Sequence, residues 1–418
     1  MTIQDLKNEK IGLCVSGGLD SRTLARKLKD SGLDVICFTA DLAQPDETDI
    51  AHVAVKMAPC GVETFIVDLK EAMAEACFEM LAAQAMYDGG YWNTTGIARA
   101  VTVRGLIAEM KKRGCTVLAH GATGRGNDQM RFERYTNVLA PEMKVYAPWR
   151  DPALLDEFPG RKQMAEYLNQ CGLEAAAGGV KRYSTDANLA GLSHEAEDLE
   201  SLLTPCTIVK PLMGVWPQDA PDKTEECTVR FEQGRAVAIN GKPVAPLQAM
   251  LTANTVGGRN GIGIKHALEN RIVGAKSRGV YEAPGMDLLG ACLRYVYQAV
   301  LDRRATKLFA TLSGLIADQV YDGRYYDPVA TAALAAVRSL AHYASGTVTV
   351  GLYRGNIHFL SLRDCPASIY NEADSSMEAA SDGLNPVSSQ GFAEIQRVEA
   401  LALARAGQIR KEIDYDLS

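Results

Sequence analysis

The sequence predicts an α/β domain built on a parallel sheet, followed by an α+β domain and a C-terminal helix. In the first part of the chain, short apolar runs alternate with amphipathic stretches, which is typical of repeated β-α-β units. After about Gly160 the pattern changes to hairpin signals and separate helices, which is typical of an α+β domain. Periodic apolar residues over 392–413 predict one long helix at the end.

Four apolar runs in the first part are predicted to be strands of one sheet. They are residues 11–15, 35–38, 64–67 and 116–119, with helices expected up to Gly32 and over 48–58, 69–86 and 96–113. Parallel sheets bind ligands beyond the carboxyl ends of their strands. We therefore expect Ser16-Gly17-Gly18, Asp41 and His120-Gly121, which follow three of these strands, to meet in one crevice.

The second part carries signals of paired strands and longer helices. A hairpin is expected over 230–243 with its turn at Asn240-Gly241, and a second pair of strands over 347–353 and 357–361. Helices are expected over 288–302 and 328–345, and residues 371–384 look like a loop. These changes suggest domains at 1–170, 171–385 and 386–418. The last helix either packs on another subunit or docks within its own chain.

The composition indicates an enzyme-like protein with a sizeable core. Hydrophobic residues make up 47% and charged residues 23%, and the formal net charge is −7. A nucleic-acid binder usually carries a basic surface, so no nucleic-acid partner is expected. No run reaches the roughly 18 apolar residues of a membrane helix, and residues 1–10 are polar, so no membrane partner is expected either. Ten cysteines without a C-x-x-C pair favour reduced thiols, a cytoplasmic location and no metal site.

The strongest local motif is Ser16-Gly17-Gly18-Leu19-Asp20-Ser21, between the first strand and the first helix. Its glycines let the backbone approach an anion, and the amide groups at the start of the helix point toward it. The two serines add hydroxyl donors, while Asp20 would repel a phosphate unless Mg²⁺ lies between them. A helix-capping turn is the alternative interpretation, but this combination directly after a first strand favours phosphate binding.

This motif resembles the signature of the PP-loop ATP pyrophosphatases, and it lacks the Gly-Lys-Ser/Thr of a Walker loop. The resemblance implies that the first domain is a parallel-sheet PP-loop nucleotide-binding domain. It also implies that ATP and Mg²⁺ are used, and that ATP is cleaved at the α–β bond to give AMP and pyrophosphate.

Four further segments are similar to the argininosuccinate synthase family in sequence, order and approximate spacing. They are 38–42 (FTADL), 120–133 (HGATGRGNDQMRFE), 183–189 (YSTDANL) with 191–195 (GLSHE), and 269–271 (ENR) with 274–282 (GAKSRGVYE). The resemblance covers most of the chain. It implies a homotetrameric ligase in which the ureido oxygen of citrulline attacks the α-phosphate of ATP. The amine of aspartate then displaces AMP to give argininosuccinate.

The same resemblance implies roles for individual residues. ATP would be held by Ser16, Gly17, Gly18, Asp20, Ser21, Ala40 and Gly121, aspartate by Thr123, Asn127 and Asp128, and citrulline by Tyr87, Asn127, Arg131, Ser184, Ser193, Glu269 and Tyr281. Asp20, Asp128 and Arg131 would be the catalytic residues. The residue types agree with this, because hydroxyl, amide and carboxylate groups at 123–128 form a compact polar set that suits an amino acid's charged groups.

Departures from the family pattern lie mostly near the second substrate. Residues 93–100 read NTTGIARA where the family has LGTSIARP, and 260–264 read NGIGI where it has HGIGR. Since Gly96 replaces a hydroxyl residue, we expect citrulline to bind more weakly than in typical members and a serine at 96 to tighten it. Arg22 replaces a small hydroxyl residue beside the phosphate loop. We expect it to point outward, because a helix start disfavours cations, with pairing to pyrophosphate as the alternative.

Two other functions stay open at this point. One is a paralogue that joins aspartate to a different ureido or acyl substrate. The other is a nucleotide-binding paralogue that regulates a partner without catalysis, although Asp20, Asp128 and Arg131 are all retained. A tRNA-thiolating enzyme is disfavoured by the acidic balance and the lack of paired cysteines.

Overall fold

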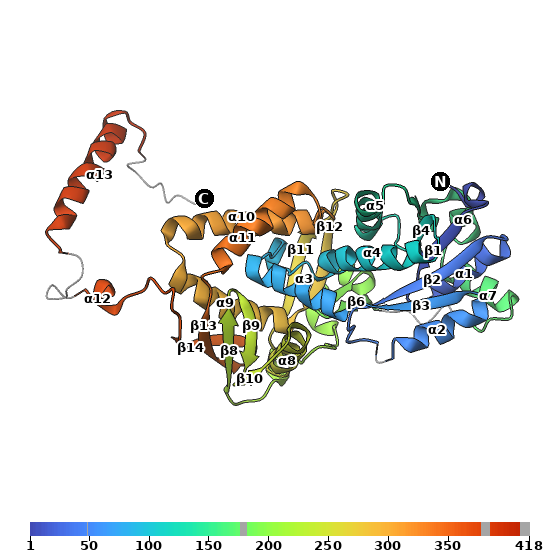
Figure 1. Ribbon diagram of the computed structural model, residues 1–418, viewed down its shortest axis with the longest axis horizontal. Helices are drawn as coiled ribbons and strands as arrows, with labels where there is room; N and C mark the ends of the chain where they lie inside the picture. The colour runs from blue at the N-terminus through green and yellow to red at the C-terminus, as the bar shows by residue number, and fades with distance from the viewer. Residues whose placement is uncertain (48, 176–181, 378–384, 410–418) are drawn as a thin grey trace. The chain divides into compact units, whose positions relative to one another are not determined.

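A computed structural model describes residues 1–47, 49–175, 182–377 and 385–409 (Figure 1). The chain divides into two compact units, Met1–Ala367 and Ser368–Ser418, each of which is described by itself. The first unit contains a parallel sheet and two antiparallel sheets. The second contains a short helix and a long one. The predicted fold class is confirmed.

The parallel sheet has five strands in the order β3-β2-β1-β4-β5. They are β1 Lys10–Cys14, β2 Asp34–Asp41, β3 Glu63–Asp68, β4 Val117–His120 and β5 Lys144–Tyr146. Four of them coincide with the predicted strands, and β5 was not predicted. The order reverses at β1, so the carboxyl ends of β1 and β4 flank a topological switch point, where ligands of such sheets bind.

Helices cover both faces of this sheet, because alternate residues of each strand point to opposite sides. Ile11 and Leu13 belong to a core shared with Leu24 and Leu28, whereas Phe38 belongs to a core shared with the opposite helices. The first core packs against α1 Leu19–Asp30, α2 Ala51–Met57, α6 Pro152–Glu157 and α7 Arg161–Gln170. The second includes α4 Thr94–Lys112 and α5 Asp128–Leu139, and continues through α3 Lys70–Ala83 into the second part of the unit.

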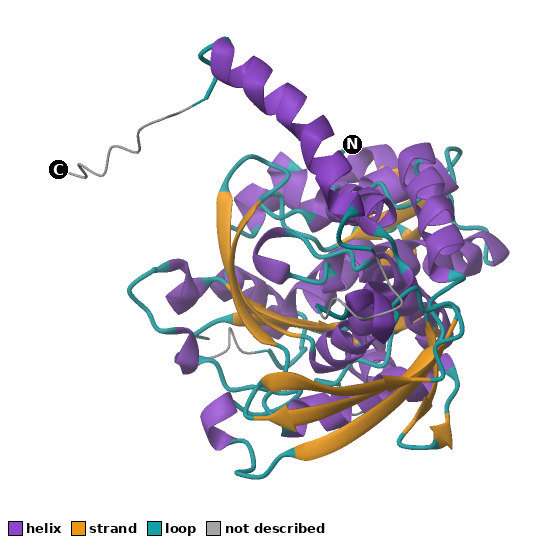
Figure 2. Cartoon of the chain, turned by 90° about the vertical axis from the view of Figure 1, so that its left-hand side faces the viewer, coloured by secondary structure: helices purple, strands orange, loops and turns teal. Residues whose placement is uncertain are grey.

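The second part has two antiparallel sheets (Figure 2). A five-stranded sheet runs β10-β9-β8-β13-β14, and a four-stranded sheet runs β11-β12-β7-β6. Their strands are β6 Ser184–Asn188, β7 Gly191–Glu195, β8 Glu225–Glu232, β9 Arg235–Ile239, β10 Lys242–Pro243, β11 Ile264–Asn270, β12 Lys276–Glu282, β13 Gly346–Tyr353 and β14 Asn356–Arg363. The accompanying helices are α8 Pro246–Arg259, α9 Pro284–Val300, α10 Arg303–Tyr321 and α11 Pro328–Ala341.

One predicted hairpin is differently built. The turn between β8 and β9 lies at Gln233-Gly234, whereas Asn240-Gly241 joins β9 to the two-residue strand β10. Both turns have positive φ at both central residues, 49° and 79° in the first and 50° and 75° in the second. Asn-Gly is the stronger sequence signal for this geometry, so the less typical Gln-Gly turn was missed.

A buried hydrogen-bonded pair fixes the register of the four-stranded sheet. His194 on β7 lies 2.7 Å from Glu282 on β12, measured between Nε2 and Oε1, and both side chains are fully buried. The Glu282 carboxylate also accepts hydrogen bonds from the backbone amides of Leu212 and Met213. In this register Ser193 lies opposite Tyr281, and Glu195 lies opposite Gly279.

The second unit contains α12 Glu372–Ser375 and α13 Ser388–Arg405. The long final helix is therefore present, but it begins four residues before the predicted start at 392 and ends at Arg405. Positions 410–413 of the predicted helix and 378–384 of the predicted loop lie outside the described residues. On α13 the side chains of Phe392, Ile395 and Val398 are exposed.

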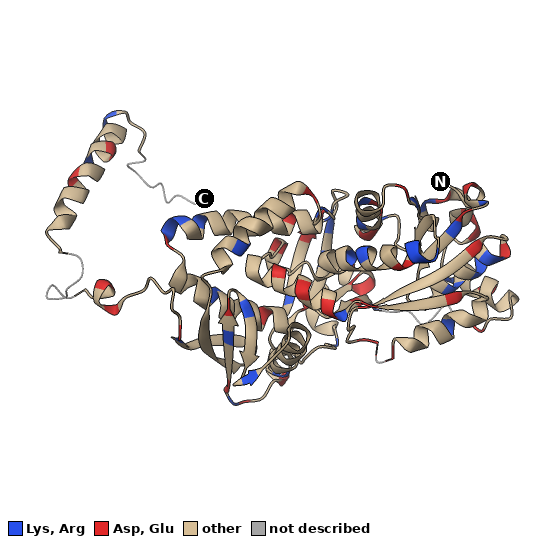
Figure 3. Cartoon of the chain, viewed as in Figure 1, with Lys and Arg blue, Asp and Glu red and all other residues tan. Residues whose placement is uncertain are grey.

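Other sequence-based expectations concern the chain as a whole. Within the described part, no helix combines the length and apolar character needed to cross a membrane. All ten cysteines are described, and none forms a disulfide. Basic and acidic side chains are interspersed along the helices and strands (Figure 3).

Candidate active site

The Ser16–Ser21 loop connects β1 to α1 and is shaped by its own side chains. The Ser16 backbone amide donates to Ser21 Oγ at 3.0 Å, and the two hydroxyl oxygens are 3.3 Å apart. Gly17 has φ 75°, a left-handed conformation that favours glycine. At Gly18 no side chain caps the start of α1. The loop therefore presents unsatisfied amide donors, as an anion site at a helix start requires.

A cleft of about 510 Å³ lies beyond the carboxyl ends of β1, β2 and β4. Its wall includes Ser16, Asp20, Ser21, Ala40, Gly121, Thr123 and Asp128 from the predicted sets. Further lining comes from Phe38, Thr39, Gln44, Asp46, Glu47, Arg99, Thr102, Phe132 and Asp186. A polar rim with an apolar floor of Phe38, Leu106 and Phe132 suits a nucleotide with a flat base and charged phosphates.

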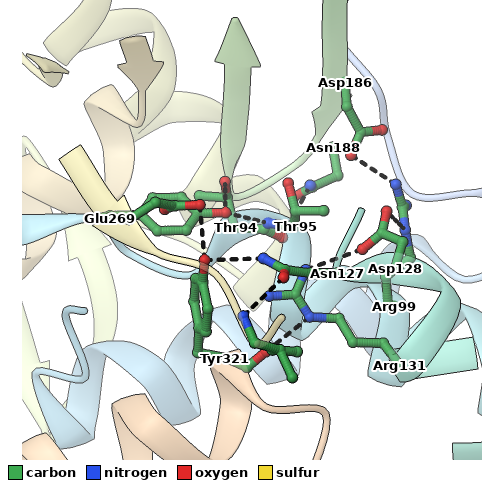
Figure 4. A network of polar contacts seen from close by, with 12 residues as sticks. Thr94, Thr95, Arg99, Asn127, Asp128, Arg131, Asp186, Asn188, Glu269 and Tyr321 are labelled. Atoms are coloured by element: carbon green, nitrogen blue, oxygen red, sulfur yellow. Dashed lines mark hydrogen bonds and ion pairs between the residues drawn. The ribbon is translucent and has the colours of Figure 1, made fainter. Parts of the chain in front are cut away.

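Asp128 lies between two arginines at one end of this cleft (Figure 4). Arg99 Nε donates to Asp128 Oδ2 at 2.8 Å, and a guanidinium nitrogen of Arg131 donates to Oδ1 at 3.0 Å. Burial alone raises the pKa of the Asp128 carboxyl, but the two guanidinium groups outweigh burial and hold it below its usual value. Asp128 is therefore a fixed negative charge at the start of α5, where the helix dipole also favours it.

A second polar cluster continues from Asn127 away from the cleft (Figure 4). Asn127 Nδ2 donates to the Tyr321 hydroxyl at 2.9 Å, and this hydroxyl donates to Glu269 Oε1 at 2.9 Å. The Tyr281 hydroxyl donates to the other Glu269 oxygen, also at 2.9 Å. Tyr87 stacks on Tyr321 with ring centroids 3.8 Å apart. Burial raises the pKa of Glu269 in spite of the two tyrosine hydroxyls.

One face of the four-stranded sheet carries hydroxyl and carboxylate groups in register. Ser184 pairs with Glu195 across β6 and β7, and Asp186 pairs with Ser193. Tyr281 lies opposite Ser193 on β12. The Tyr281 ring lies over Gly279, where a Cβ atom would come within 2.4 Å of it. The bare glycine thus leaves room for the ring beside the polar groups of this face.

The geometry can be compared with known proteins at this point. The family model described as Arginosuccinate synthase N-terminal HUP domain matches residues 10–174, and the one described as Arginosuccinate synthase C-terminal domain matches residues 183–403. The chain belongs to the argininosuccinate synthase family. The argininosuccinate synthase of Rhodopirellula baltica is 39% identical over 387 residues, which cover 92% of this chain and 95% of that relative. The chain is therefore an ATP-dependent ligase with an N-terminal nucleotide-binding HUP domain.

Two solved structures resemble this argininosuccinate synthase family member only distantly. A predicted subunit of tRNA methyltransferase from Methanocaldococcus jannaschii is 13% identical, with a TM-score of 0.26, and covers 40% of this chain and 89% of that one. The NAD+ synthetase from Burkholderia pseudomallei is 17% identical, with a TM-score of 0.27, and covers 42% and 65%. At these scores neither supports a conclusion about this family member.

The structure brings most of the residues implied by the argininosuccinate synthase resemblance into two adjoining groups. The ATP set and two aspartate residues, Thr123 and Asp128, lie at the cleft, and the citrulline set lies around Glu269 and the sheet face. Asn127 lies between the groups. Arg131, Ser193, Glu269 and Tyr281 are buried, whereas Ser184 is exposed.

Asp41 and His120 were expected to lie in the crevice, but neither of them lines the cleft. Asp41 does not line the cleft, because its carboxylate pairs with Lys70 at 2.7 Å. His120 is fully buried and stacks on Phe132 with ring centroids 5.0 Å apart. Burial, with repulsion from Arg150, lowers the pKa of His120 to about 4, so the ring is neutral at physiological pH. In both segments it is the neighbouring residue, Ala40 or Gly121, that reaches the cleft.

The two departures noted in the sequence have clear structural settings. Arg22 donates to the backbone carbonyl of Glu174 at 2.9 Å and does not line the cleft, as expected for an outward side chain. Gly96 is buried against α10, and a Cβ atom there would lie 3.0 Å from the carbonyl oxygen of Val320. The glycine thus allows α4 to pack closely against α10, and the weaker binding of citrulline expected from the sequence stays a prediction.

Several residues of the site were not identified from the sequence. Arg99, Asp186, Glu195 and Tyr321 all lie in or beside the two groups. Asp186 falls within a segment that resembles the family and Arg99 within one that departs from it, but nothing local distinguishes these two residues from surface charges. Tyr321 ends α10, a helix that the pattern analysis did not predict.

Proposed function

We propose that this ligase condenses aspartate with citrulline, or a close ureido analogue, and releases argininosuccinate, AMP and pyrophosphate. Family membership supports the reaction class. The observation that carries the proposal is a chain of polar contacts from Asp128 through Arg131 to Tyr321, whose hydroxyl bonds to both Asn127 and Glu269. This chain joins the proposed nucleotide cleft to a second group of polar side chains, as a reaction between an adenylate and an amine requires.

In the first step, the ureido oxygen attacks the α-phosphate of ATP while the phosphate loop holds the departing pyrophosphate. The amides of the Gly17-Gly18 segment and the hydroxyls of Ser16 and Ser21, which lie together at the start of α1, support this role. Ala40 and Gly121 would contact the nucleotide. Catalysis then consists mainly of positioning and charge stabilisation.

Magnesium fits the loop as an ion carried by the phosphates. Asp20 lines the cleft and is 42% exposed, and its carboxylate makes a long contact of 3.7 Å with Arg161, so it could serve as a single protein ligand. No group of three or more histidine, cysteine or acidic side chains that could hold a metal is found within the described ranges. Mg²⁺ is usually bound by one or two carboxylates together with substrate phosphates, and it would neutralise charge on the leaving pyrophosphate.

In the second step, the aspartate amine attacks the adenylated carbon and AMP departs. The fixed charge of Asp128 suits the substrate ammonium, and Thr123 and Asn127 suit its α-carboxylate. Arg131 donates hydrogen bonds to the Asp128 carboxylate and to the backbone carbonyl of Tyr321. From this position it would orient the second substrate. Tyr87, Ser184, Ser193, Glu269 and Tyr281 would complete that pocket.

The two alternative functions, a different second substrate and a non-catalytic regulatory role, make different demands on the site. A different ureido or acyl compound would use the same cleft and the same aspartate residues but another fit around Glu269. A regulatory, non-catalytic protein would not need the charged pair of Arg131 and Asp128 at the junction of the two pockets. This arrangement favours catalysis.

We also propose the wider organisation of the enzyme. The division at 1–170, 171–385 and 386–418 assigns nucleotide binding to the first domain, substrate binding and multimerisation to the second, and oligomerisation to the C-terminal helix. The exposed apolar residues of α13 favour a helix that packs on another subunit in a homotetramer. The acidic composition and the absence of a C-x-x-C pair favour a cytoplasmic enzyme.

The test is ATP–pyrophosphate exchange with citrulline and a panel of ureido and carboxyl compounds, without aspartate. We expect citrulline to support exchange, and the complete reaction to yield AMP and pyrophosphate. ADP and orthophosphate as products would refute the cleavage mechanism. Exchange with another compound but none with citrulline would refute citrulline as the substrate and support the paralogue.

A further inference from the structure

The cleft wall has a marked imbalance of charge. Its carboxylates are those of Asp20, Asp46, Glu47, Asp128 and Asp186. Among the described residues that line it, Arg99 is the single lysine or arginine. Yet both ligands of the proposed reaction that enter here, ATP and aspartate, are anions. Arg99 is therefore the side chain of this wall that can attract them electrostatically.

Arg99 is also held in a defined position. Its side chain is 18% exposed and bridges two carboxylates, with Nε donating to Asp128 at 2.8 Å and one terminal nitrogen donating to Asp186 at 2.7 Å. Arg99 belongs to α4 and Asp186 to β6, so the bridge links the parallel-sheet region to the four-stranded sheet (Figure 4). A guanidinium has five N–H donors in a rigid plane, so donors remain for a third carboxylate.

We propose that Arg99 binds the side-chain carboxylate of the aspartate substrate and thereby selects aspartate over neutral amino acids. This rests on the proposed function, which places the substrate ammonium at Asp128. Since Arg99 contacts Asp128 directly, a substrate bound there has its side-chain carboxylate within reach of the guanidinium. An α-carboxylate and an ammonium are common to all amino acids, so recognition of aspartate requires a cation for the third charged group.

Selection follows from the chemistry of this pairing. Arg99 has N–H donors left after its bonds to Asp128 and Asp186, and these donors favour a ligand that brings a further carboxylate. A bidentate guanidinium–carboxylate pair is the geometry that arginine favours. Asparagine is nearly the same size as aspartate but lacks the negative charge. Asp186 and Asp128 keep the guanidinium oriented and compensated before the substrate arrives, so binding does not require a buried, unpaired charge.

The test compares Arg99→Met with a matched control on the same helix. Lys111→Met removes a cation from the far end of α4, where Lys111 pairs with Glu142 at the surface. Three quantities are measured on the full chain. They are the KM for ATP in citrulline-dependent exchange, the KM for aspartate in argininosuccinate formation, and the calorimetric affinities for aspartate and asparagine with ATP present.

We expect Arg99→Met to raise the KM for aspartate about ten- to a hundredfold. This fold-increase should be at least about ten times the fold-increase in the KM for ATP. In Arg99→Met the ratio of the affinities for aspartate and asparagine should shrink by a similar factor. Arg99→Lys should recover part of this preference for aspartate. Lys111→Met should leave the KM values and the affinities unchanged. Equal rises in both KM values, or an unchanged preference, would overturn the inference. Calorimetry needs no turnover, so it tests whether Arg99 binds aspartate even if citrulline supports no exchange. Failure of this inference and failure of the proposed function can therefore be told apart.

Discussion

Tyr321 donates its hydroxyl hydrogen to Glu269 over 2.9 Å and so connects the end of α10 with β11. The same hydroxyl accepts from Asn127 at the start of α5. One phenol group therefore ties the proposed aspartate residues to the proposed citrulline pocket, although its helix has no place in the sequence motifs.

Replacing Tyr321 by phenylalanine should weaken the binding of the second substrate. The change leaves one oxygen of buried Glu269 and the amide of Asn127 without their partner, which costs about 1.5–3 kcal/mol for a bond to a charged group. We expect the KM for citrulline in pyrophosphate exchange to rise about tenfold or more. Tyr353→Phe is the control, because the Tyr353 hydroxyl contacts Asp222 at the surface of another sheet. Equal effects of the two changes would contradict the assignment.

Asp128→Asn and Thr123→Ala should separate the two steps. Asparagine keeps the shape of Asp128 but loses the charge proposed to hold the substrate ammonium, so kcat/KM for aspartate should fall about ten- to a hundredfold. Exchange without aspartate should fall less. Steady-state assays of the complete reaction and of exchange measure the two effects. An equal loss in both would mean that position 128 serves the nucleotide rather than aspartate.

Gly96→Ser should destabilise the protein, whatever its effect on the binding of citrulline. A side chain at 96 presses on the Val320 carbonyl, and overpacking of a buried site costs about 1–3 kcal/mol. A melting curve should therefore shift down by several degrees. Gly314→Ala on α10 is the control, because a Cβ atom there meets nothing within 4 Å. A tighter citrulline complex with unchanged melting would support the interpretation made from the sequence.

Glu195 should make stability depend on pH. Burial, with repulsion from Glu269, raises its pKa from 4.5 to about 7, so the folded protein binds more protons than the unfolded chain between these values. The stabilising contribution is fully present below pH 4.5 and is lost as the pH rises through 7. Glu195→Gln removes this loss. Urea unfolding should show the variant to be the more stable at about pH 8, with the difference vanishing near pH 4.5; a difference independent of pH would contradict the assignment.

The sequence predicted features that local pattern determines. Apolar runs located β1 to β4, and the Ser16–Ser21 loop was recognised because its chemistry is written in consecutive residues. Features made by distant residues were missed. Arg99 meets Asp186 across 87 positions, and Ser193 faces Tyr281 only because β7 pairs with β12 in one register. The close approach of Gly96 to α10 could not be predicted, because the loss of a side chain looks the same in a sequence whether it opens a pocket or lets a helix pack closely.

The buried pair of His194 and Glu282 has a consequence for inherited or engineered variation. These residues point away from the face that carries Ser193 and Tyr281, because neighbours on a strand alternate. A slip of β7 by one position would exchange the two faces, turning His194 toward the proposed substrate site and Ser193 away from it. The pair therefore keeps β7 aligned with β12. We expect a substitution such as His194→Leu to weaken substrate binding by shifting this alignment, although position 194 lies on the face opposite Ser193 and Tyr281.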